Sequence, residues 1–356
     1  MTLGITMIVK NEKDVLSRAL GGVKSFADEI VVVDTGSTDG TPDIARGFTD
    51  KVYSYEWNDD FSAARNFALS KSTADYWMWL DADDVVPERT AAEISRFKMR
   101  PSGVDVVMLP YVMGYDKNGK PTFFFYRERI IKKGSGVWEG RVHEAVAPRG
   151  TIRYLNCPIV HDKPAGKSSG TRNLDIYRKM AAHGERFSPR DKYYYARELF
   201  FAGLYENAER ELIEFLSDGK GSFANNADAC IILSRCNKKR GDIVRAKDAA
   251  IAALEYGVPS GEICCEIASC FFEQGEYGSA AYWYELALKA GADKKSGAFV
   301  NGECCGFIPL VWLSVCYDRL GETKKAFRYH KKAMRIRPDD PSIAANSAYF
   351  SSLGLS

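Results

Sequence analysis

Short apolar runs and amphipathic segments alternate along the first half of the chain. Apolar runs at Leu3–Val9, Glu29–Asp34 and 76–80 predict strands, and apolar residues at helical spacing between them predict helices. The same pattern predicts strands over 51–55 and 104–110, helices over 43–48, 61–70 and 87–98, and a hairpin over 111–126 that turns at 116–120. Alternating strands and helices joined by short turns favour an α/β sheet that is largely parallel.

The second half carries an internal repeat instead of strand signals. The pattern G-x-x-x-x-A occurs at Gly203, Gly241, Gly275 and Gly321, with steps of 38, 34 and 46 residues. Each unit predicts a helix hairpin, because glycine permits the turn and alanine lets the second helix approach the first. The repeat resembles the tetratricopeptide repeat (TPR), whose period is about 34 residues. The longer last step predicts an insertion around 294–307.

These patterns predict an α/β domain at 1–164, a linker and connecting helix at 165–187, and a TPR-like all-α solenoid at 188–356. The linker starts with the small, polar stretch 165–170. Stacked hairpins form a concave groove that usually binds peptides. Aromatic residues are candidates for its lining, with the hairpin core or a homodimer contact as the alternatives: Tyr193, Tyr194, Tyr195, Phe271, Phe272, Tyr282, Trp283 and Tyr284.

Composition narrows the class of protein. The 356 residues are 46% hydrophobic and 27% charged, with a net charge of +2, which is typical of a globular protein and gives no reason to expect nucleic acid as the main partner. The sequence shows neither a signal peptide nor an apolar run long enough to span a membrane, so we expect a cytoplasmic protein. Eight of the nine cysteines follow Cys157 and none forms C-x-x-C, which favours buried thiols.

Three acids follow the apolar run 76–80 within four residues: Asp81, Asp83 and Asp84. Clustered carboxylates repel one another, so a positive group is expected among them. Their hard oxygen ligands suit Mg²⁺ or Mn²⁺, ions that typically hold the phosphates of a substrate. The alternative is a solvated turn in which one acid caps the following helix, and Asp84 is the acid that we expect to be the cap.

Polar residues end other predicted strands too. Asn11, Asp34 and Asp81 all follow strands, and ligands collect at the carboxyl ends of strands in such sheets. The small residues after Asp34, including Gly36 and Ser37, allow the backbone to turn sharply near a ligand. Arg65 lies near the start of the helix that precedes the acidic strand, where a surface arginine is the alternative.

Four segments together, 6–12, 31–41, 64–66 and 80–84, resemble the family 2 glycosyltransferases, which have the GT-A fold. The resemblance covers roughly the first 165 residues. It implies a UDP-sugar donor and a divalent metal, Mn²⁺ or Mg²⁺. The residues it implicates are Asn11 and Glu12 in the nucleoside pocket, Asp34 and Arg65 at the uracil, Gly36 and Ser37 in the second uridine-binding motif, Asp81 and Ala82 at the ribose or sugar, and Asp83 on the metal.

The segment 138–144 resembles a W-x-G-x-x-H-E element near the acceptor of similar enzymes. It implies Glu144 as catalytic base, Glu139 as the reserve candidate, and substrate contacts from Trp138, Arg141 and His143. On composition alone the segment also fits an amphipathic edge strand. The resemblance further implies a late histidine as metal ligand: His161, with His143 as the alternative. A purely structural histidine is the other interpretation of His161.

These features predict an inverting, metal-dependent transfer of a hexose from a UDP-sugar to Ser, Thr or Cys of a peptide or protein. The pairing of domains resembles bacterial enzymes that glycosylate bacteriocin precursors or flagellin, and the solenoid would bind the acceptor. One alternative is a glycosyltransferase with a cell-surface polysaccharide or lipid-linked acceptor. The other is a non-catalytic adaptor that binds nucleotide sugars.

Overall fold

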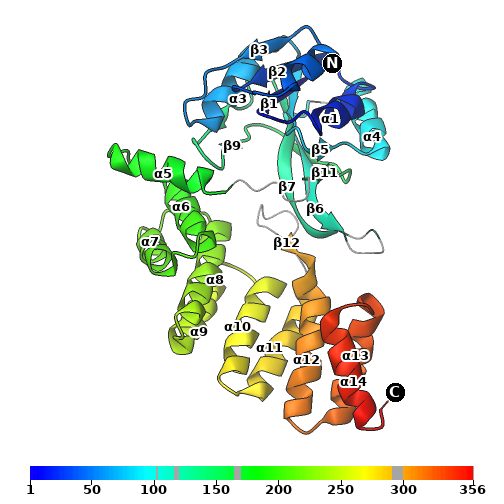
Figure 1. Cartoon of the computed structure of the whole chain (residues 1–356), viewed down its shortest axis with the longest axis vertical. Helices are drawn as coiled ribbons and strands as arrows, with labels where there is room; N and C mark the ends of the chain where they lie inside the picture. Colours follow the sequence, from blue (N-terminus) through cyan, green and yellow to red (C-terminus); the bar gives the residue numbers. More distant parts are fainter. Residues whose placement is uncertain (102, 116–118, 120, 164–169, 291–299, 356) are drawn as a thin grey trace. The chain divides into compact units, whose positions relative to one another are not determined.

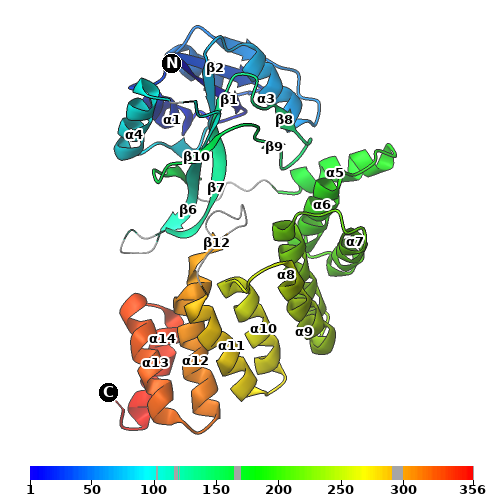
Figure 2. The ribbon, with the colours of Figure 1, turned by 180° about the vertical axis from the view of Figure 1, so that it is seen from behind.

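The computed structural model describes all residues except 102, 116–118, 120, 164–169, 291–299 and 356. The chain divides into two compact units, Met1–Glu185 and Arg186–Ser356 (Figures 1 and 2). Nearly all of the stretch 165–170, with which the predicted linker and connecting helix 165–187 begins, lies outside the described residues, so these limits stay a prediction.

The first unit is built on a mixed, mostly parallel sheet with the strand order β3-β2-β1-β4-β7-β6-β11-β5. Strands β3, β2, β1 and β4 are parallel neighbours, whereas β7 runs antiparallel to both β4 and β6. The predicted α/β fold is therefore confirmed. The strands are β1 (Leu3–Val9), β2 (Glu29–Asp34), β3 (Val52–Ser54), β4 (Tyr76–Trp79), β5 (Asp84–Val85), β6 (Val106–Tyr115), β7 (Pro121–Lys132), β8 (Trp138–Glu139), β9 (Ala145–Val146), β10 (Ile152–Tyr154) and β11 (Ile159–His161).

Helices cover both faces of the sheet at β1 and β2, which explains why these strands are largely apolar. Ile5 and Met7 pack with α1 and α4 on one face, and Val31 and Val33 pack with α3 on the other. Figure 1 shows α1 and α4 on one side of β1 and α3 on the opposite side, and Figure 2 agrees. The helices of this unit are α1 (Leu16–Val23), α2 (Thr41–Arg46), α3 (Phe61–Ser70), α4 (Glu88–Met99) and α5 (Arg172–Ala182).

Strands β6 and β7 form a longer antiparallel pair than the pattern predicted. The expected strand at 104–110 and the first arm of the expected hairpin are one continuous strand, β6. Register shifts beside Val107 and Val112 let the pair bend without interrupting it. Most of the predicted turn, residues 116–118 and 120, lies outside the described residues.

The second unit is a succession of helix hairpins, as predicted (Figure 1). The repeat glycines Gly203, Gly241, Gly275 and Gly321 have φ between 77° and 82°, a left-handed conformation that favours glycine. The repeat alanines Ala208, Ala246, Ala280 and Ala326 are fully buried between paired helices. No described helix is long and apolar enough to cross a membrane.

The helices of the second unit are α6 (Pro189–Phe201), α7 (Tyr205–Ser217), α8 (Phe223–Lys239), α9 (Ile243–Ala252), α10 (Gly261–Glu273), α11 (Tyr277–Lys289), α12 (Phe307–Arg319), α13 (Thr323–Ile336) and α14 (Pro341–Ser352). The predicted insertion falls between α11 and α12. Its described part includes the short strand β12 (Val300–Asn301) and the 3-10 turn Gly302–Cys305.

The aromatic residues considered for the groove differ in burial, and four are half-buried: Tyr195, Phe271, Phe272 and Trp283. Tyr193, Tyr194 and Tyr284 are buried in the hairpin core, whereas Tyr282 is 64% exposed. The core alternative therefore holds for Tyr193, Tyr194 and Tyr284. All nine cysteines are free thiols, and seven are buried, as expected from their spacing.

Candidate active site

The loops that follow β1 and β2 are tied to each other at the carboxyl edge of the sheet. The backbone N–H of Asn11 donates to Ser37 Oγ (2.9 Å), and Asn11 Oδ1 accepts from the N–H of Thr38 (2.8 Å). The Asp34 carboxylate accepts from the N–H groups of Gly36 and Ser37 at 3.2 and 3.1 Å. These hydrogen bonds join the two loops and fix the turn after Asp34 at the carboxyl ends of β1 and β2, where the sequence predicts a nucleoside pocket.

Arg65, on α3, connects two acids that lie 63 positions apart in the chain. Its Nη2 donates to Asp81 Oδ1 (2.7 Å) and its Nε to Glu144 Oε1 (2.6 Å). The guanidinium is also close to the rings of Trp138 and Trp79, at 4.8 and 5.2 Å from their centroids. Burial alone would lower the pKa of Arg65, but the charges of Asp81 and Glu144 outweigh it and raise the pKa. Arg65 is therefore a permanent cation that holds both acids.

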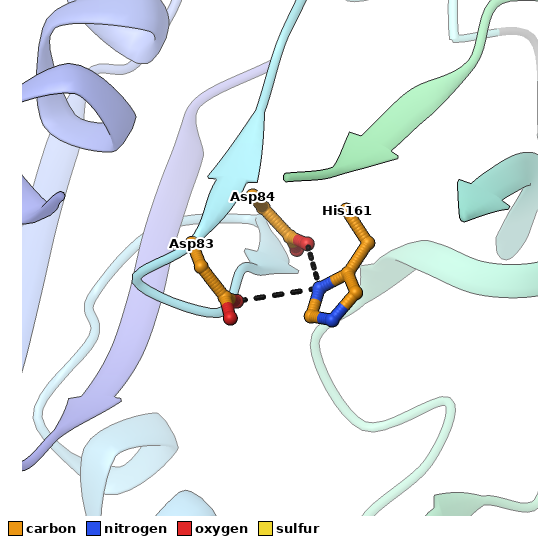
Figure 3. Close-up of side chains that lie close together, drawn as sticks. All are labelled: Asp83, Asp84 and His161. Atoms are coloured by element: carbon orange, nitrogen blue, oxygen red, sulfur yellow. Dashed lines mark ion pairs between the residues drawn. The ribbon is translucent and has the colours of Figure 1, made fainter. Parts of the chain in front are cut away.

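Asp83, Asp84 and His161 converge beside this arrangement (Figure 3). His161 Nδ1 lies 3.3 Å from Asp83 Oδ1 and 3.8 Å from Asp84 Oδ1. The convergence follows from strand pairing, because His161 on β11 is the antiparallel partner of Asp84 on β5. The nearby carboxylates of Asp83 and Asp84 raise the pKa of His161 to about 10 against the opposing effect of burial.

The three residues fit a divalent cation. One ligand atom from each lies within 4.8 Å of the others. Asp84 Oδ1 is buried and, within the part of the chain that the structure describes, accepts no hydrogen bond. An unsatisfied buried carboxylate oxygen beside a second carboxylate and an imidazole is a donor set suited to ions such as Mn²⁺.

The prediction that Asp84 caps the next helix is wrong. Asp84 is fully buried in β5, where its Oδ2 accepts from Arg129 Nη1 (2.9 Å) and from the backbone N–H of Asp81 (3.1 Å). Helix α4 starts four residues later, with Pro87 at its N-cap. Pairing with β11 keeps the chain extended at Asp84, so the acid turns inward instead of capping the helix.

Known proteins similar to this chain show which family the first unit belongs to. Residues 5–146, which include both loops, Arg65 and the acids, match the model of glycosyl transferase family 2. The first unit contains a family 2 glycosyltransferase domain. The resemblance of the four segments to this family is thereby confirmed.

Relatives exist for both halves of the chain. Glycosyltransferase SunS of Bacillus subtilis is 28% identical over 222 residues, covering 58% of this chain and 51% of SunS. A TPR repeat-containing protein of Synechococcus elongatus is 46% identical over 82 residues, covering 23% of this chain and 20% of that protein. The lipopolysaccharide core biosynthesis glycosyltransferase LpsC of Rhizobium meliloti is 27% identical over 179 residues, covering 46% of this chain and 64% of LpsC. The chain thus spans less than two thirds of each of these relatives.

The structure places only some residues of the segment 138–144, the predicted acceptor element, beside Arg65. Glu144 reaches Arg65, whereas Glu139 is exposed on β8. Arg141 forms an ion pair with Glu185 (3.1 Å), and His143 adopts a left-handed backbone conformation with φ of 52°. Of the two histidines considered as metal ligands, His161 is the one that joins the acids. Trp138 is buried, and its ring packs against the guanidinium of Arg65.

Sequence reasoning missed two residues of the glycosyltransferase domain that border the acids. Arg129 is fully buried beside Asp84, and the Tyr111 hydroxyl lies 2.8 Å from His161 Nδ1. The acid cluster predicted a positive partner but did not say which one. A usable signal was present, because Arg129 directly precedes the apolar pair Ile130 and Ile131, and an arginine in a buried strand needs an acid.

Proposed function

We propose that this chain is a metal-dependent inverting glycosyltransferase that moves a hexose from a UDP-sugar to a side chain of a peptide or protein. The observation that carries the proposal is the convergence of Asp83, Asp84 and His161 beside the Arg65–Asp81 pair, within a family 2 glycosyltransferase domain. Each of these groups lies at the carboxyl edge of the sheet, where α/β folds bind ligands.

Different residues of the chain would bind different parts of the donor. The interlocked loops around Asn11 and Asp34 would hold the nucleoside, and Asp81 would face the ribose or the sugar. Asp83, Asp84 and His161 would hold the divalent cation. When bound, such an ion stabilises the negative charge that develops on a diphosphate leaving group.

Glu144 is the candidate base for the transfer. In an inverting displacement the acceptor oxygen or sulfur bonds to the anomeric carbon as the bond to the diphosphate breaks, and the acceptor proton passes to a base. Arg65 holds the Glu144 carboxylate in place and also binds Asp81. One guanidinium would therefore align the proton acceptor with the donor side of the site.

The length of the region similar to each relative supports the proposal of a peptide or protein acceptor. The region similar to SunS covers 58% of this chain, which is longer than the 185 residues of the first unit, so it reaches into the helical repeats. Repeat solenoids commonly present an extended surface to peptides. The region similar to LpsC covers 46% of this chain and is short enough to lie within the first unit. A lipopolysaccharide-type acceptor is the second candidate.

The test uses the full chain with Mn²⁺ and a panel of UDP-sugars, and measures the release of UDP without an acceptor. We expect slow hydrolysis of at least one donor, lost in Asp83→Asn and retained in the control Asp43→Asn, whose side chain is 82% exposed on α2. Absence of both donor binding and hydrolysis in the wild-type chain would contradict the enzyme assignment, whereas donor binding without hydrolysis or transfer would favour the adaptor. Unchanged hydrolysis in Asp83→Asn would contradict the metal site.

The acceptor class is tested by mass spectrometry after incubation with the active donor. Candidate peptides and lipid-linked saccharides are offered separately. A hexose added to a Ser, Thr or Cys side chain supports the first candidate. Modification of only the saccharide acceptors would favour the second.

A further inference from the structure

We propose that Arg129 is a positioning residue for the divalent-cation site: it fixes one oxygen of Asp84 and thereby presents the other to the cation. The inference rests on the proposed function, because it assumes that Asp83, Asp84 and His161 bind a metal. It adds a residue that takes no direct part in metal binding.

Arg129 is completely buried, and its guanidinium contacts Asp84, Trp79 and Tyr111. Its Nη1 donates to Asp84 Oδ2 (2.9 Å) and to the backbone carbonyl of Trp79 (3.1 Å). Its guanidinium carbon lies 3.6 Å from the centroid of the Trp79 ring and 4.2 Å from that of Tyr111. A flat cation packed between two rings has little freedom to turn. Arg129 can therefore serve as a fixed anchor for the acid.

The two oxygens of Asp84 have different surroundings. Oδ2 accepts from Arg129 and from the backbone N–H of Asp81. Oδ1 is buried without a hydrogen-bond donor among the described residues and lies 3.8 Å from His161 Nδ1. Because Oδ2 accepts these two hydrogen bonds, the plane of the carboxylate is fixed and Oδ1 stays on the side of Asp83 and His161.

Charge gives a second reason for the pairing. A carboxylate with no exposure to solvent is strongly disfavoured unless a cation accompanies it. Arg129 is the cation that hydrogen-bonds to Asp84, and neither side chain has any solvent exposure. Arg129 therefore offsets the cost of burying the Asp84 carboxylate.

The same residue also touches the other supports of the cluster. Tyr111 packs on Arg129 with its ring and approaches His161 with its hydroxyl. Trp79 is the last residue of β4, so the hydrogen bond to its carbonyl connects Arg129 to the strand that precedes Asp83 and Asp84 in the chain. Displacing Arg129 would remove the hydrogen bond to Asp84 and the hydrogen bond to the end of β4 at the same time.

The test is Mn²⁺ binding by the full chain, followed through the electron paramagnetic resonance signal of free Mn²⁺, with Arg129→Lys. Lysine keeps the charge but lacks the flat guanidinium that packs between the two rings. Outer-shell partners of metal ligands typically change metal affinity by about 10- to 100-fold, and we expect a weakening in that range. Thermal unfolding without Mn²⁺ is measured alongside, to separate affinity from stability.

Arg197→Lys is the matched control. Arg197 lies in the helical unit and also pairs with a carboxylate, that of Asp228, at 2.7 Å. It should leave Mn²⁺ affinity unchanged. Wild-type Mn²⁺ affinity in folded Arg129→Lys would overturn the positioning role, and so would an equal weakening in Arg197→Lys.

A second comparison covers the case in which Arg129→Lys does not fold. Asp84→Asn is compared with the double variant Asp84→Asn/Arg129→Met, in which no buried charge is left without a partner. Because Arg129 acts through the Asp84 carboxylate, we expect both variants to bind Mn²⁺ more weakly than the wild type and by the same factor. Wild-type affinity in Asp84→Asn, or a further tenfold loss in the double variant, would overturn the role. If the wild-type chain itself binds no Mn²⁺, it is the proposed metal site that fails.

Discussion

Glu29 supports a specific prediction about the stability of the first unit. Its carboxylate, at the start of β2, accepts hydrogen bonds from Lys51, from the Ser72 hydroxyl, and from the backbone N–H and hydroxyl of Thr73 (3.0 and 3.1 Å). These contacts join β2 to the segment before β3 and to the loop before β4. Glu29→Gln removes the charge and keeps the shape of the side chain.

The expected effect follows from the pKa. Burial would raise the pKa of Glu29, but the bonds from Lys51, Ser72 and Thr73 lower it from 4.5 to about 2. Such a difference corresponds to ~3 kcal/mol of folding free energy at neutral pH. The Lys51 side chain is 39% exposed, so solvent screening reduces the contribution to ~2 kcal/mol. For a unit of 185 residues this predicts a melting temperature lower by ~4–8 °C.

The sign of the pH dependence is also determined. Because the folded pKa lies below the unfolded one, the stabilisation is complete above about pH 4.5 and disappears as the pH falls towards about 2. The difference between wild type and Glu29→Gln should therefore be full at pH 7 and shrink steadily below pH 4.5.

Thermal unfolding followed by tryptophan fluorescence measures both effects, because four of the six tryptophans lie in the first unit. Glu56→Gln, at an exposed position before α3, is the control and should change the melting temperature by less than 1 °C at pH 7. A melting temperature of Glu29→Gln within 1 °C of wild type at pH 7 would refute the reasoning. So would a difference that grows on acidification.

Three further predictions concern the site and the repeats. Glu144→Gln should retain affinity for the UDP-sugar and lower transfer to an acceptor by at least ~10²-fold in steady-state assays, since glutamine cannot take the proton; transfer at the wild-type rate would exclude Glu144 as base. Arg65→Met should lower the free energy of unfolding in urea by ~3–5 kcal/mol, because Asp81 and Glu144 lose their common cation, and a loss below 1 kcal/mol would contradict the bridging role. Ala280→Leu should destabilise the helical unit by ~1–3 kcal/mol in chemical denaturation, because Ala280 is fully buried where α11 meets α10, and unchanged stability would contradict close packing there.

The period of the apolar residues and the positions of the strand ends were enough to predict most of the fold from the sequence. Apolar runs located β1, β2 and β4, and the residues that follow them, Asn11, Asp34 and Asp81, meet at one edge because parallel strands share a direction. The helix hairpins were equally accessible, since a glycine and an alanine five positions apart mark each turn and each close contact. These are local rules, so a single sequence is enough to apply them.

The part of the site that sequence reasoning did not reach depends on pairing between distant strands. Asp84 was expected at a helix cap because its neighbours in the chain favour one. Its true environment is set by β11, about 75 residues later, and by Arg129 on β7. Likewise, the pairing of Arg65 with Asp81 and Glu144 was not predicted, although Arg65 itself was a candidate site residue. No local pattern states which acid a buried arginine will find.

The surroundings of Trp79 give the domain a built-in optical reporter. Three guanidinium groups, those of Arg65, Arg127 and Arg129, lie 5.2, 4.8 and 3.6 Å from the centroid of its indole ring. Indole emission depends on the electric field across the ring, and two of these cations hold the acids of the site. Movement of either arginine when a ligand arrives would change the colour and intensity of that emission, so occupancy could be followed without attaching any dye.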